Sequence, residues 1–396
     1  MPQHQDPVVI VSAARTPMGA FQGDFSDLAA HDLGGAAIAA AVARAGIQPE
    51  QVEEVLFGNC LMAGQGQAPA RQAGFKGGLP QSTGAVTLSK MCGAGMEATI
   101  LAHDQLIAGS RDVMIAGGME SMTNAPYLLK KGRAGYRMGH DKVYDHMMLD
   151  GLEDAYEAGR SMGTFGEDCA AKYQFTREAQ DAFAIASVQR AQQAAQSGAF
   201  DAEITPVTVK TRKGDVTISV DEGPAKAKLD KIGGLKPAFK KDGTITAASS
   251  SSINDGAAAM VLMRESTAKQ LDCKPLARIV SHATFAQAPE WFTTAPVGAT
   301  EKALKKAGWK VEDVDLWEIN EAFAVVPMAL MAEMKVPHDK VNVHGGACAL
   351  GHPIGASGAR ILVTLIHALQ RHGKQRGLAT LCIGGGEGTA MAIELV

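Results

Sequence analysis

The stretch Val8-Val9-Ile10-Val11-Ser12-Ala13-Ala14 near the start of the chain has a counterpart at Ala277-Arg278-Ile279-Val280-Ser281-His282-Ala283. Short apolar runs of this kind are typical of buried strands. Each run is followed by a helical pattern of small residues that ends at a glycine in the place of a C-cap, Gly46 and Gly308. Because internal similarity points to a repeated architecture, the sequence predicts a fold made of two related halves.

Later segments of the two halves also correspond. The expected strand at 52–59 matches the segment at 311–320, and both end on an asparagine. A helical stretch that begins at Cys92 matches one that begins at His352, and a glycine-tailed strand follows each. Two such β-α-β-α-β copies imply two α/β layers with helices on their faces. If the copies pack about a pseudo-twofold axis, the two helix starts face each other and bring Cys92 to His352.

The composition is that of a globular protein. A chain of 396 residues exceeds what one hydrophobic core usually serves, so two or three domains are expected. With 46% hydrophobic residues, 20% charged residues and a formal net charge of −4, nothing electrostatic suggests nucleic acid as a partner. No targeting leader and no apolar run near the ~18 residues of a membrane span are visible, so we expect a cytoplasmic protein without membrane contact.

The six cysteines and the histidines give no sign of a metal site. No Cys-x-x-Cys pair is present, which argues against a zinc ribbon or a disulfide scaffold and predicts reduced thiols. His344, Cys348 and His352 have the spacing of ligands on one helix face. Gly351 and Pro353 disfavour a continuous helix there, so we expect no metal.

The middle of the chain does not repeat. It contains a helical pattern at 176–198 and a charged strand-turn segment at 208–220. Its polar, glycine-rich composition suggests an inserted lid or substrate-binding domain, with an oligomerisation arm as the alternative. The expected division is an N-terminal half at 1–120 plus 251–272, an insertion at 121–250 and a C-terminal half at 273–396.

Three reactive side chains lie among glycines: Cys92 in Met91-Cys92-Gly93-Ala94-Gly95, His352 in Gly351-His352-Pro353-Ile354-Gly355, and Cys382 in Leu381-Cys382-Ile383-Gly384-Gly385-Gly386. Glycine lets backbone approach a ligand closely, so these settings suit a nucleophile, its base and a second acid or base. N–H groups at the expected helix start predict a thiolate at Cys92. The alternatives are a buried structural cysteine, a helix-capping histidine and a cysteine in a strand core. Asn320 either caps the helix after it or orients a catalytic water.

Together these motifs resemble the thiolase family over essentially the whole chain. The resemblance is carried by Met91-Cys92-Gly93-x-Gly95, Asn320-Glu321-Ala322-Phe323, Gly351-His352-Pro353-Ile354-Gly355-Ala356-Ser357-Gly358 and Cys382-Ile383-Gly384-Gly385-Gly386. It is strongest for the short-chain, biosynthetic type of the family. It implies an α/β fold in which duplicated βαβαβ halves form five α-β-α-β-α layers with an inserted loop domain.

The resemblance also implies the catalytic roles. Cys92, activated by His352, would accept an acyl group from coenzyme A, and Cys382 would deprotonate the methyl group of a second acetyl-CoA. His352 and a water held by Asn320 would form one oxyanion hole, and the N–H groups of Cys92 and Gly384 the other. The implied activity is the reversible Claisen condensation of two acetyl-CoA to acetoacetyl-CoA and CoA, an acetyl-CoA C-acetyltransferase reaction. Coenzyme A is a substrate and product there, and no cofactor is expected.

At the substrate pocket, the resemblance implies a short acyl chain. Met162 matches a methionine that limits the acyl pocket in short-chain members, which favours acetoacetyl-CoA. Ser251 matches the serine that meets pantetheine. The other positions implied to contact substrate are Leu152, Ala247 and Ala322.

Departures from the family pattern keep alternatives open. The family commonly has histidine at the position of Ser161 and a Gly-Asn-Ala-Ser-Gly run at 248–252. A degradative 3-ketoacyl-CoA thiolase of broader chain length is the main alternative. A decarboxylating ketoacyl synthase fits less well, because it pairs its cysteine with two histidines, and a non-catalytic CoA-binding protein is the alternative from another class. The resemblance further implies a homo-oligomer, a dimer or a tetramer.

Overall fold

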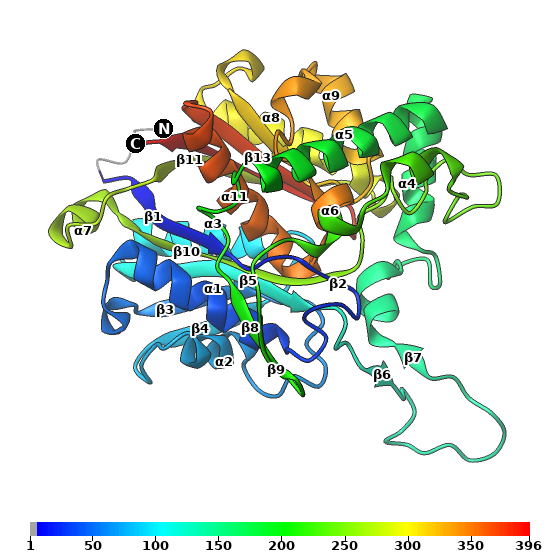
Figure 1. Cartoon of the computed structure of the whole chain (residues 1–396), viewed down its shortest axis with the longest axis horizontal. Coiled ribbons are helices and arrows are strands. Elements are labelled where there is room, and N and C mark those ends of the chain that lie inside the picture. Colours follow the sequence, from blue (N-terminus) through cyan, green and yellow to red (C-terminus); the bar gives the residue numbers. More distant parts are fainter. Residues whose placement is uncertain (1–5) are drawn as a thin grey trace.

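A computed structural model describes residues 6–396, and Figure 1 shows how its helices cover a central sheet. The ten-stranded sheet has the order β12-β13-β14-β11-β1-β10-β5-β3-β4, and the short β2 pairs with β10. The strands are β1 (Val8–Arg15), β2 (Gly19–Ala20), β3 (Glu54–Gly58), β4 (Gly84–Leu88), β5 (Val113–Ser121), β10 (Asn254–Arg264), β11 (Ala277–Ala286), β12 (Leu316–Ile319), β13 (Arg376–Ile383) and β14 (Glu387–Leu395). The two halves of the chain meet where β1 pairs with β11 through Val9 and Ile10.

The predicted duplication is confirmed in detail. The strand order β3-β5-β10-β1 of the N-terminal half corresponds to β12-β13-β14-β11 of the C-terminal half. The register of β1 on β10 shifts just before Ser12, and that of β11 on β14 shifts just before Ser281. Each serine hydroxyl then donates to a helix carbonyl, Ser12 to Ala41 at 2.6 Å and Ser281 to Ala303 at 2.7 Å. The same bulge with the same hydrogen bond therefore occurs at equivalent positions of both halves, which shows that it is a regular part of the fold.

The helices complete five α-β-α-β-α layers, as expected. Helices α1 and α2 cover the outer face of the N-terminal strands, α8 and α9 cover the C-terminal strands, and α3 packs against α11 between the two parts. The helices of the two halves are α1 (Ala30–Ala45), α2 (Pro69–Lys76), α3 (Ala94–Ile107), α7 (Glu265–Gln270), α8 (Ala295–Ala307), α9 (Val325–Met334), α10 (Ala347–Leu350) and α11 (Ile354–Arg371). The 3-10 segments of the two halves are η1 (Pro49–Gln51), η4 (Pro289–Thr294), η5 (Val311–Asp313) and η6 (His338–Lys340).

The sequence predicted the C-terminal ends of the helices more accurately than their first residues. Gly46 and Gly308 both have φ of 70°, the left-handed C-cap conformation that was expected of them. The helices expected to begin at Cys92 and His352 instead begin at Ala94 and Ile354. In each case the reactive residue therefore lies in the turn before the helix, where its side chain is not committed to helix packing.

The segment between β5 and β10 carries small elements of its own. These are β6 (Tyr127–Leu128), β7 (Tyr144–Asp145), η2 (Met148–Leu152), α4 (Met162–Tyr173), α5 (Arg177–Gln196), β8 (Val207–Thr211), β9 (Gly214–Ile218), α6 (Glu222–Lys226) and η3 (Leu229–Gly234). The loop between β6 and β7 projects away from the body of the protein (Figure 1). Thr176 caps α5 by accepting the Ala179 N–H at 3.2 Å, so the helix begins next to the start of the helical pattern predicted at 176–198. Across residues 6–396, no helix is both long and apolar enough to cross a membrane.

Candidate active site

Cys92 lies in a tight turn between β4 and α3. Met91, just before it, has φ of 45°, which side-chain-bearing residues rarely adopt and which stores strain beside the thiol. Gly93, just after it, approaches β13 so closely that a Cβ there would lie 2.4 Å from Ile383 Cδ1. The absence of a side chain at 93 thus lets the turn rest directly on the strand that carries Cys382.

The structure brings Cys92, Cys382 and Gly384 together. The N–H of Gly384 donates to the Cys92 sulfur, and Cys382 interacts electrostatically with Cys92. Burial raises the pKa of the Cys92 thiol to about 11 and that of Cys382 well above its ordinary value. The thiolate expected at Cys92 is therefore wrong for the resting protein, because desolvation outweighs the N–H groups of Gly384 and of Cys92 itself.

His352 is held in one tautomer by Ser357. Its Nδ1 lies 2.5 Å from Ser357 Oγ, and Ser357 Oγ also lies 2.9 Å from the Pro353 carbonyl oxygen. The hydroxyl has one proton, and the carbonyl oxygen accepts it, so Nδ1 of His352 carries its own proton and donates to Ser357. The other ring nitrogen, Nε2, then has a lone pair available as a base. Burial, together with the charge of Arg360, lowers the pKa of His352 to about 3, which keeps the imidazole neutral.

Asn320 directly follows β12, and its N–H donates to the carbonyl of Thr380 on β13 at 3.0 Å. The residue is fully buried, and among residues 6–396 neither atom of its side-chain amide has a hydrogen-bond partner. The same holds for His352 Nε2 within that range. Buried polar atoms are nearly always satisfied in proteins, so these atoms suit a water or a substrate oxygen. The capping alternative for Asn320 is wrong, because α9 begins only at Val325 and its N-cap has no side-chain bond.

Glycines allow the starts of α3 and α11 to lie side by side. A Cβ on Gly58, at the end of β3, would lie 2.6 Å from the Gly355 carbonyl oxygen and 2.7 Å from the Ala94 carbonyl carbon. A Cβ on Gly95 would lie 2.7 Å from the Ala359 nitrogen. The backbones of both helices and of β3 are therefore in direct contact, which places the two reactive turns at the same end of the strands.

A buried carboxylate secures this contact. Glu120 accepts hydrogen bonds from the N–H of Gly355 at 2.9 Å, of Cys60 at 2.9 Å and of Leu61 at 3.1 Å, and from Asn59 Nδ2 at 2.6 Å. Burial raises the pKa of Glu120 to about 7 in spite of these donors. The carboxylate thus joins the start of α11 in one half to the end of β3 in the other.

The residues expected to bind substrate surround the two cysteines in most cases. Met162, at the start of α4, packs in the same apolar cluster as Cys382 and Ala322, and its Sδ lies 3.4 Å from where a Cβ on Gly384 would be. Leu152 packs in a second cluster together with Cys92. The Ser251 N–H donates to the Ala322 carbonyl at 2.9 Å. Ala247 lies exposed in the preceding turn.

Comparison with known proteins assigns the family. The family models described as "Thiolase, N-terminal domain" and "Thiolase, C-terminal domain" match residues 8–266 and 273–395. The chain belongs to the thiolase family. It is 50% identical to an acetyl-CoA acetyltransferase of Cupriavidus necator over 98% of this chain and 99% of that protein. It is 46% identical to a probable acetyl-CoA acyltransferase of Staphylococcus aureus over 98% of both.

Solved thiolases share the fold over nearly the whole chain. The acetyl-CoA acetyltransferase of Bacillus anthracis superposes with a TM-score of 0.96 at 41% identity and covers 99% of both chains. The Acat5 thiolase of Ascaris suum, solved in complex with coenzyme A, superposes with a TM-score of 0.93 at 41% identity and covers 98% of this chain and all of its own.

Several residues of this thiolase site escaped the sequence analysis. Ser357 lies within the glycine-rich motif around His352, and its position one helical turn into α11 was an available signal. Cys60 gave no signal, yet its thiol lies 3.4 Å from the Met91 carbonyl oxygen, next to the Cys92 turn. Glu120 gave none either, because its four donors lie far from it in the sequence, three of them at 59–61 and the fourth at Gly355.

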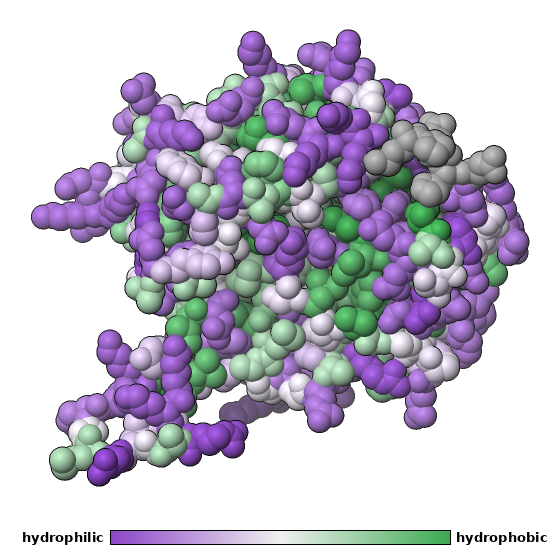
Figure 2. Space-filling view, turned by 180° about the vertical axis from the view of Figure 1, so that it is seen from behind, coloured by the Kyte–Doolittle hydropathy of each residue, from purple (hydrophilic) through white to green (hydrophobic). Residues whose placement is uncertain are grey.

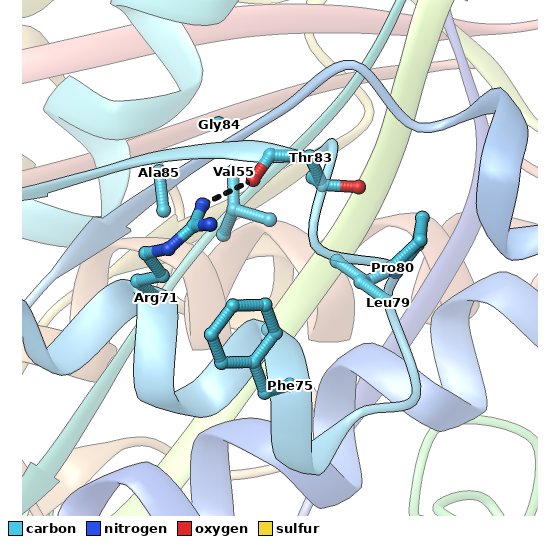
Figure 3. A pocket seen from close by; sticks show the side chains of 9 residues that line it. Val55, Arg71, Phe75, Leu79, Pro80, Thr83, Gly84 and Ala85 are labelled. Atoms are coloured by element: carbon cyan, nitrogen blue, oxygen red, sulfur yellow. Dashed lines mark hydrogen bonds between the residues drawn. The ribbon is translucent and has the colours of Figure 1, made fainter.

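A surface crevice at the other end of β3 is separate from this site. It lies between α2 and the segment before β4, as Figure 3 shows, and is lined by Val55, Arg71, Gly74, Phe75, Leu79, Pro80, Thr83, Gly84 and Ala85. Arg71 donates to the Thr83 carbonyl at 2.6 Å and lies 4.6 Å above the Phe75 ring. These contacts fill the crevice, which has no room for a water molecule, so we assign it no binding role.

Proposed function

We propose that this thiolase is an acetyl-CoA C-acetyltransferase that converts two acetyl-CoA into acetoacetyl-CoA and CoA, reversibly, through an acyl group on Cys92. The observation that carries the proposal is the contact between Cys92 and the Cys382-to-Gly384 segment of the other half. Two buried thiols within electrostatic range of each other, one with a backbone donor on its sulfur, suit a reaction with a nucleophile and a separate base for a carbon acid.

In the first half-reaction Cys92 attacks the thioester carbonyl of acetyl-CoA. His352 Nε2 takes the thiol proton as the new sulfur–carbon bond forms, because the neutral imidazole has its lone pair on that nitrogen. The bond between the carbonyl carbon and the CoA sulfur breaks, and Cys382 gives its proton to the departing CoA thiolate. The raised pKa of Cys382 supports this step, since the residue holds a proton at rest that it can donate.

In the second half-reaction the Cys382 thiolate removes a proton from the methyl group of a second acetyl-CoA. The resulting carbanion attacks the acetyl carbonyl on Cys92, a carbon–carbon bond forms, and the bond to the Cys92 sulfur breaks. The proton held on His352 returns to Cys92, which restores the starting state. Protons balance over the cycle because Cys382 gives one and later takes one.

Two separate sets of donors suit the two oxyanions. The N–H of Gly384, already directed at the Cys92 sulfur, would face the oxygen of the acyl group on that sulfur. Protonated His352 Nε2 and a water on the Asn320 amide would face the enolate oxygen of the second acetyl-CoA. Donors held in place before the reaction stabilise developing charge without reorganisation, and one such donor is typically worth about 3 kcal/mol.

Met162 supports a short acyl chain. Its Sδ lies over Gly384 and closes the space beside the two cysteines. We assign Met162, Leu152, Ala322, Ser251 and Ala247 to the substrate pocket, with 121–250 as the substrate-binding insertion between the halves at 1–120 plus 251–272 and 273–396. Within this proposal the degradative thiolase of broader chain length is the competing activity.

A substrate series tests the proposal. Thiolysis rates are measured with 3-ketoacyl-CoA of increasing length, and kcat/KM is expected to be highest for acetoacetyl-CoA and to fall steeply with each added pair of carbons. Met162→Ala is expected to flatten that decline while the rate with acetoacetyl-CoA changes little. Low activity on acetoacetyl-CoA beside high activity on long substrates would assign the protein to the degradative class instead.

We also propose that the protein forms a homo-oligomer, a dimer or a tetramer. In the described sheet β4 is an edge strand, and its Val86 is 44% exposed. Edge strands with exposed apolar side chains favour pairing with another chain. Hydrophobic side chains also gather in a patch on the face in Figure 2, and Met138 in the β6–β7 loop is 98% exposed. Light scattering is expected to give a multiple of the 41.3 kDa chain mass, lowered by Val86→Glu; a monomeric mass for the unmodified protein would contradict the proposal.

A cytoplasmic location stays a prediction of the sequence. All six cysteines are free, in agreement with the expectation of reduced thiols. Fractionation of the producing cell, with detection by antibody, tests the location directly.

A further inference from the structure

His103, Asp104 and His282 form a cluster of possible metal ligands apart from the candidate active site. His103 and Asp104 lie near the end of α3, and His282 lies on β11 of the other half. His103 Nδ1 is 2.9 Å from Asp104 Oδ1, His282 Nε2 is 3.2 Å from His103 Nδ1, and His282 Nε2 is 3.1 Å from Asp104 Oδ1. Three donor atoms thus form a nearly equilateral triangle.

The dimensions of this triangle fit a bound first-row metal ion. Zinc bonds of about 2.0 Å to nitrogen and oxygen in a tetrahedral site separate the donor atoms by about 3.3 Å. The observed separations differ from this by only a few tenths of an ångström. The two imidazole rings meet edge-on, with planes at 78° and centroids 4.9 Å apart, so the nitrogens converge without ring stacking.

The cluster is also accessible and has a suitable charge. The side chains of His103 and His282 are 17% and 16% exposed, and that of Asp104 is 57% exposed, which leaves an open side for entry and for a water ligand. Glu97 adds a second carboxylate within electrostatic range of Asp104. Lys306 of α8 is the nearby cation; its Nζ donates to the His282 carbonyl at 2.9 Å, on the backbone side of that residue.

We propose that His103 Nδ1, Asp104 Oδ1 and His282 Nε2 bind a divalent first-row metal ion of the zinc type. Two imidazoles and one carboxylate prefer Zn²⁺, Co²⁺ or Ni²⁺ to Mg²⁺ or Ca²⁺, which favour oxygen ligands. Each ring binds the ion through the lone pair of the named nitrogen, so the ion replaces the hydrogen bonds that now join the three side chains. The bound ion links α3, the helix that follows Cys92, to β11 of the C-terminal half, so it stabilises the contact between the halves.

Calorimetric titration of the full chain with Zn²⁺ tests the site. The thiols are first alkylated with iodoacetamide, because cysteine thiolates are strong competing zinc ligands. We expect one ion per chain in the unmodified sequence, and an affinity at least about tenfold lower in His282→Ala and in Asp104→Asn. His140→Ala removes an exposed histidine of the β6–β7 loop and is the matched control, with unchanged binding.

Thermal unfolding and cobalt spectra distinguish metal binding at this cluster from metal binding at thiols. Zn²⁺ is expected to raise the thermal-unfolding midpoint of the chain without substitutions and of His140→Ala. It is not expected to raise the midpoint of His282→Ala, since a ligand stabilises only a state that binds it. Co²⁺ is expected to give visible bands without the near-ultraviolet absorption of thiolate ligation. As a control, metal-free His282→Ala is expected to keep the thermal-unfolding midpoint and the acetoacetyl-CoA thiolysis rate of the original chain, which shows that the variant is folded. Equal Zn²⁺ affinity in His282→Ala and the unmodified chain, or fewer than one ion bound per chain, would overturn the proposal.

Discussion

Replacement of Gly93 by alanine is expected to displace the Cys92 turn from β13. The backbone of Gly93 has ordinary helical angles, so alanine adds only steric conflict. Its Cβ would lie 2.4 Å from Ile383 Cδ1 and 3.1 Å from Thr389 Cγ2. Carbon atoms pack at about 3.5 Å, so Ile383 Cδ1 must move by about 1 Å. Ile383 Cγ1 at 3.0 Å and Thr389 Cγ2 also lie too close, so the turn moves away from the strand as well.

The cost of that displacement follows from two independent effects. Overpacking of a close contact destabilises a protein by about 1–3 kcal/mol. A shift of about 1 Å in a catalytic group lowers the rate by up to about a hundredfold. We therefore expect Gly93→Ala to lower kcat for acetoacetyl-CoA thiolysis by about tenfold to a hundredfold, with a smaller change in KM.

A second substitution makes this reasoning testable. Ile383→Val removes the Cδ1 atom and keeps the rest of the side chain, so Gly93→Ala with Ile383→Val is expected to recover most of the lost kcat. The double-mutant cycle should give a coupling of about 1 kcal/mol or more. Gly233→Ala is the control, because a Cβ there meets nothing within 4 Å. Full activity of Gly93→Ala, or the absence of rescue by Ile383→Val, would refute the argument.

Other predictions concern the reactive groups themselves. Ser357→Ala leaves the Nδ1–H of His352 buried without a partner, which costs about 1–3 kcal/mol, so kcat is expected to fall by at least about tenfold with folding retained; an unchanged kcat contradicts the assigned tautomer. Because the pKa of Cys92 is about 11, its thiolate fraction rises with pH, and iodoacetamide inactivation should accelerate about tenfold per pH unit from pH 7 to 9. A plateau near pH 8 is incompatible with that pKa. Cys92→Ser is expected to abolish turnover, whereas Cys382→Ser should spare acylation of Cys92 more than condensation; equal loss of the acylation burst in rapid-quench experiments would reverse the assigned roles.

The duplicated fold was predictable because its signals are local. A buried strand, a helix of small residues and a C-cap glycine each depend on a few neighbouring residues, so both copies could be recognised at Gly46 and Gly308. The two halves also share the hydrogen bonds that the hydroxyls of Ser12 and Ser281 donate to a helix. The sequence pattern does not predict the β-bulges that precede these two serines.

The properties of the site depend on contacts between the halves, which the sequence does not display. The helix start before Ala94 predicted a thiolate at Cys92, but burial against the C-terminal half reverses the balance. Glu120 and His282 gave no signal, because their partners lie far from them in the sequence. Glu120 accepts from residues 59–61 of its own half and from Gly355 of the other, and His282 lies beside His103 and Asp104. Sequence reasoning thus picked out Cys92 and Cys382, which the fold brings together, but it misjudged the charge of Cys92.

The charge state of the site has a consequence for its chemistry. Burial raises the pKa of Cys92 to about 11 and lowers that of His352 to about 3, so it opposes transfer of a proton from one to the other before substrate arrives. In the proposed mechanism the neutral pair is therefore the resting state, and the proton leaves Cys92 as its sulfur bonds to the acyl carbon. Charge then appears on the carbonyl oxygen, where the Gly384 N–H is available to receive it. A site built this way keeps both thiols protonated near neutral pH until a thioester is in place.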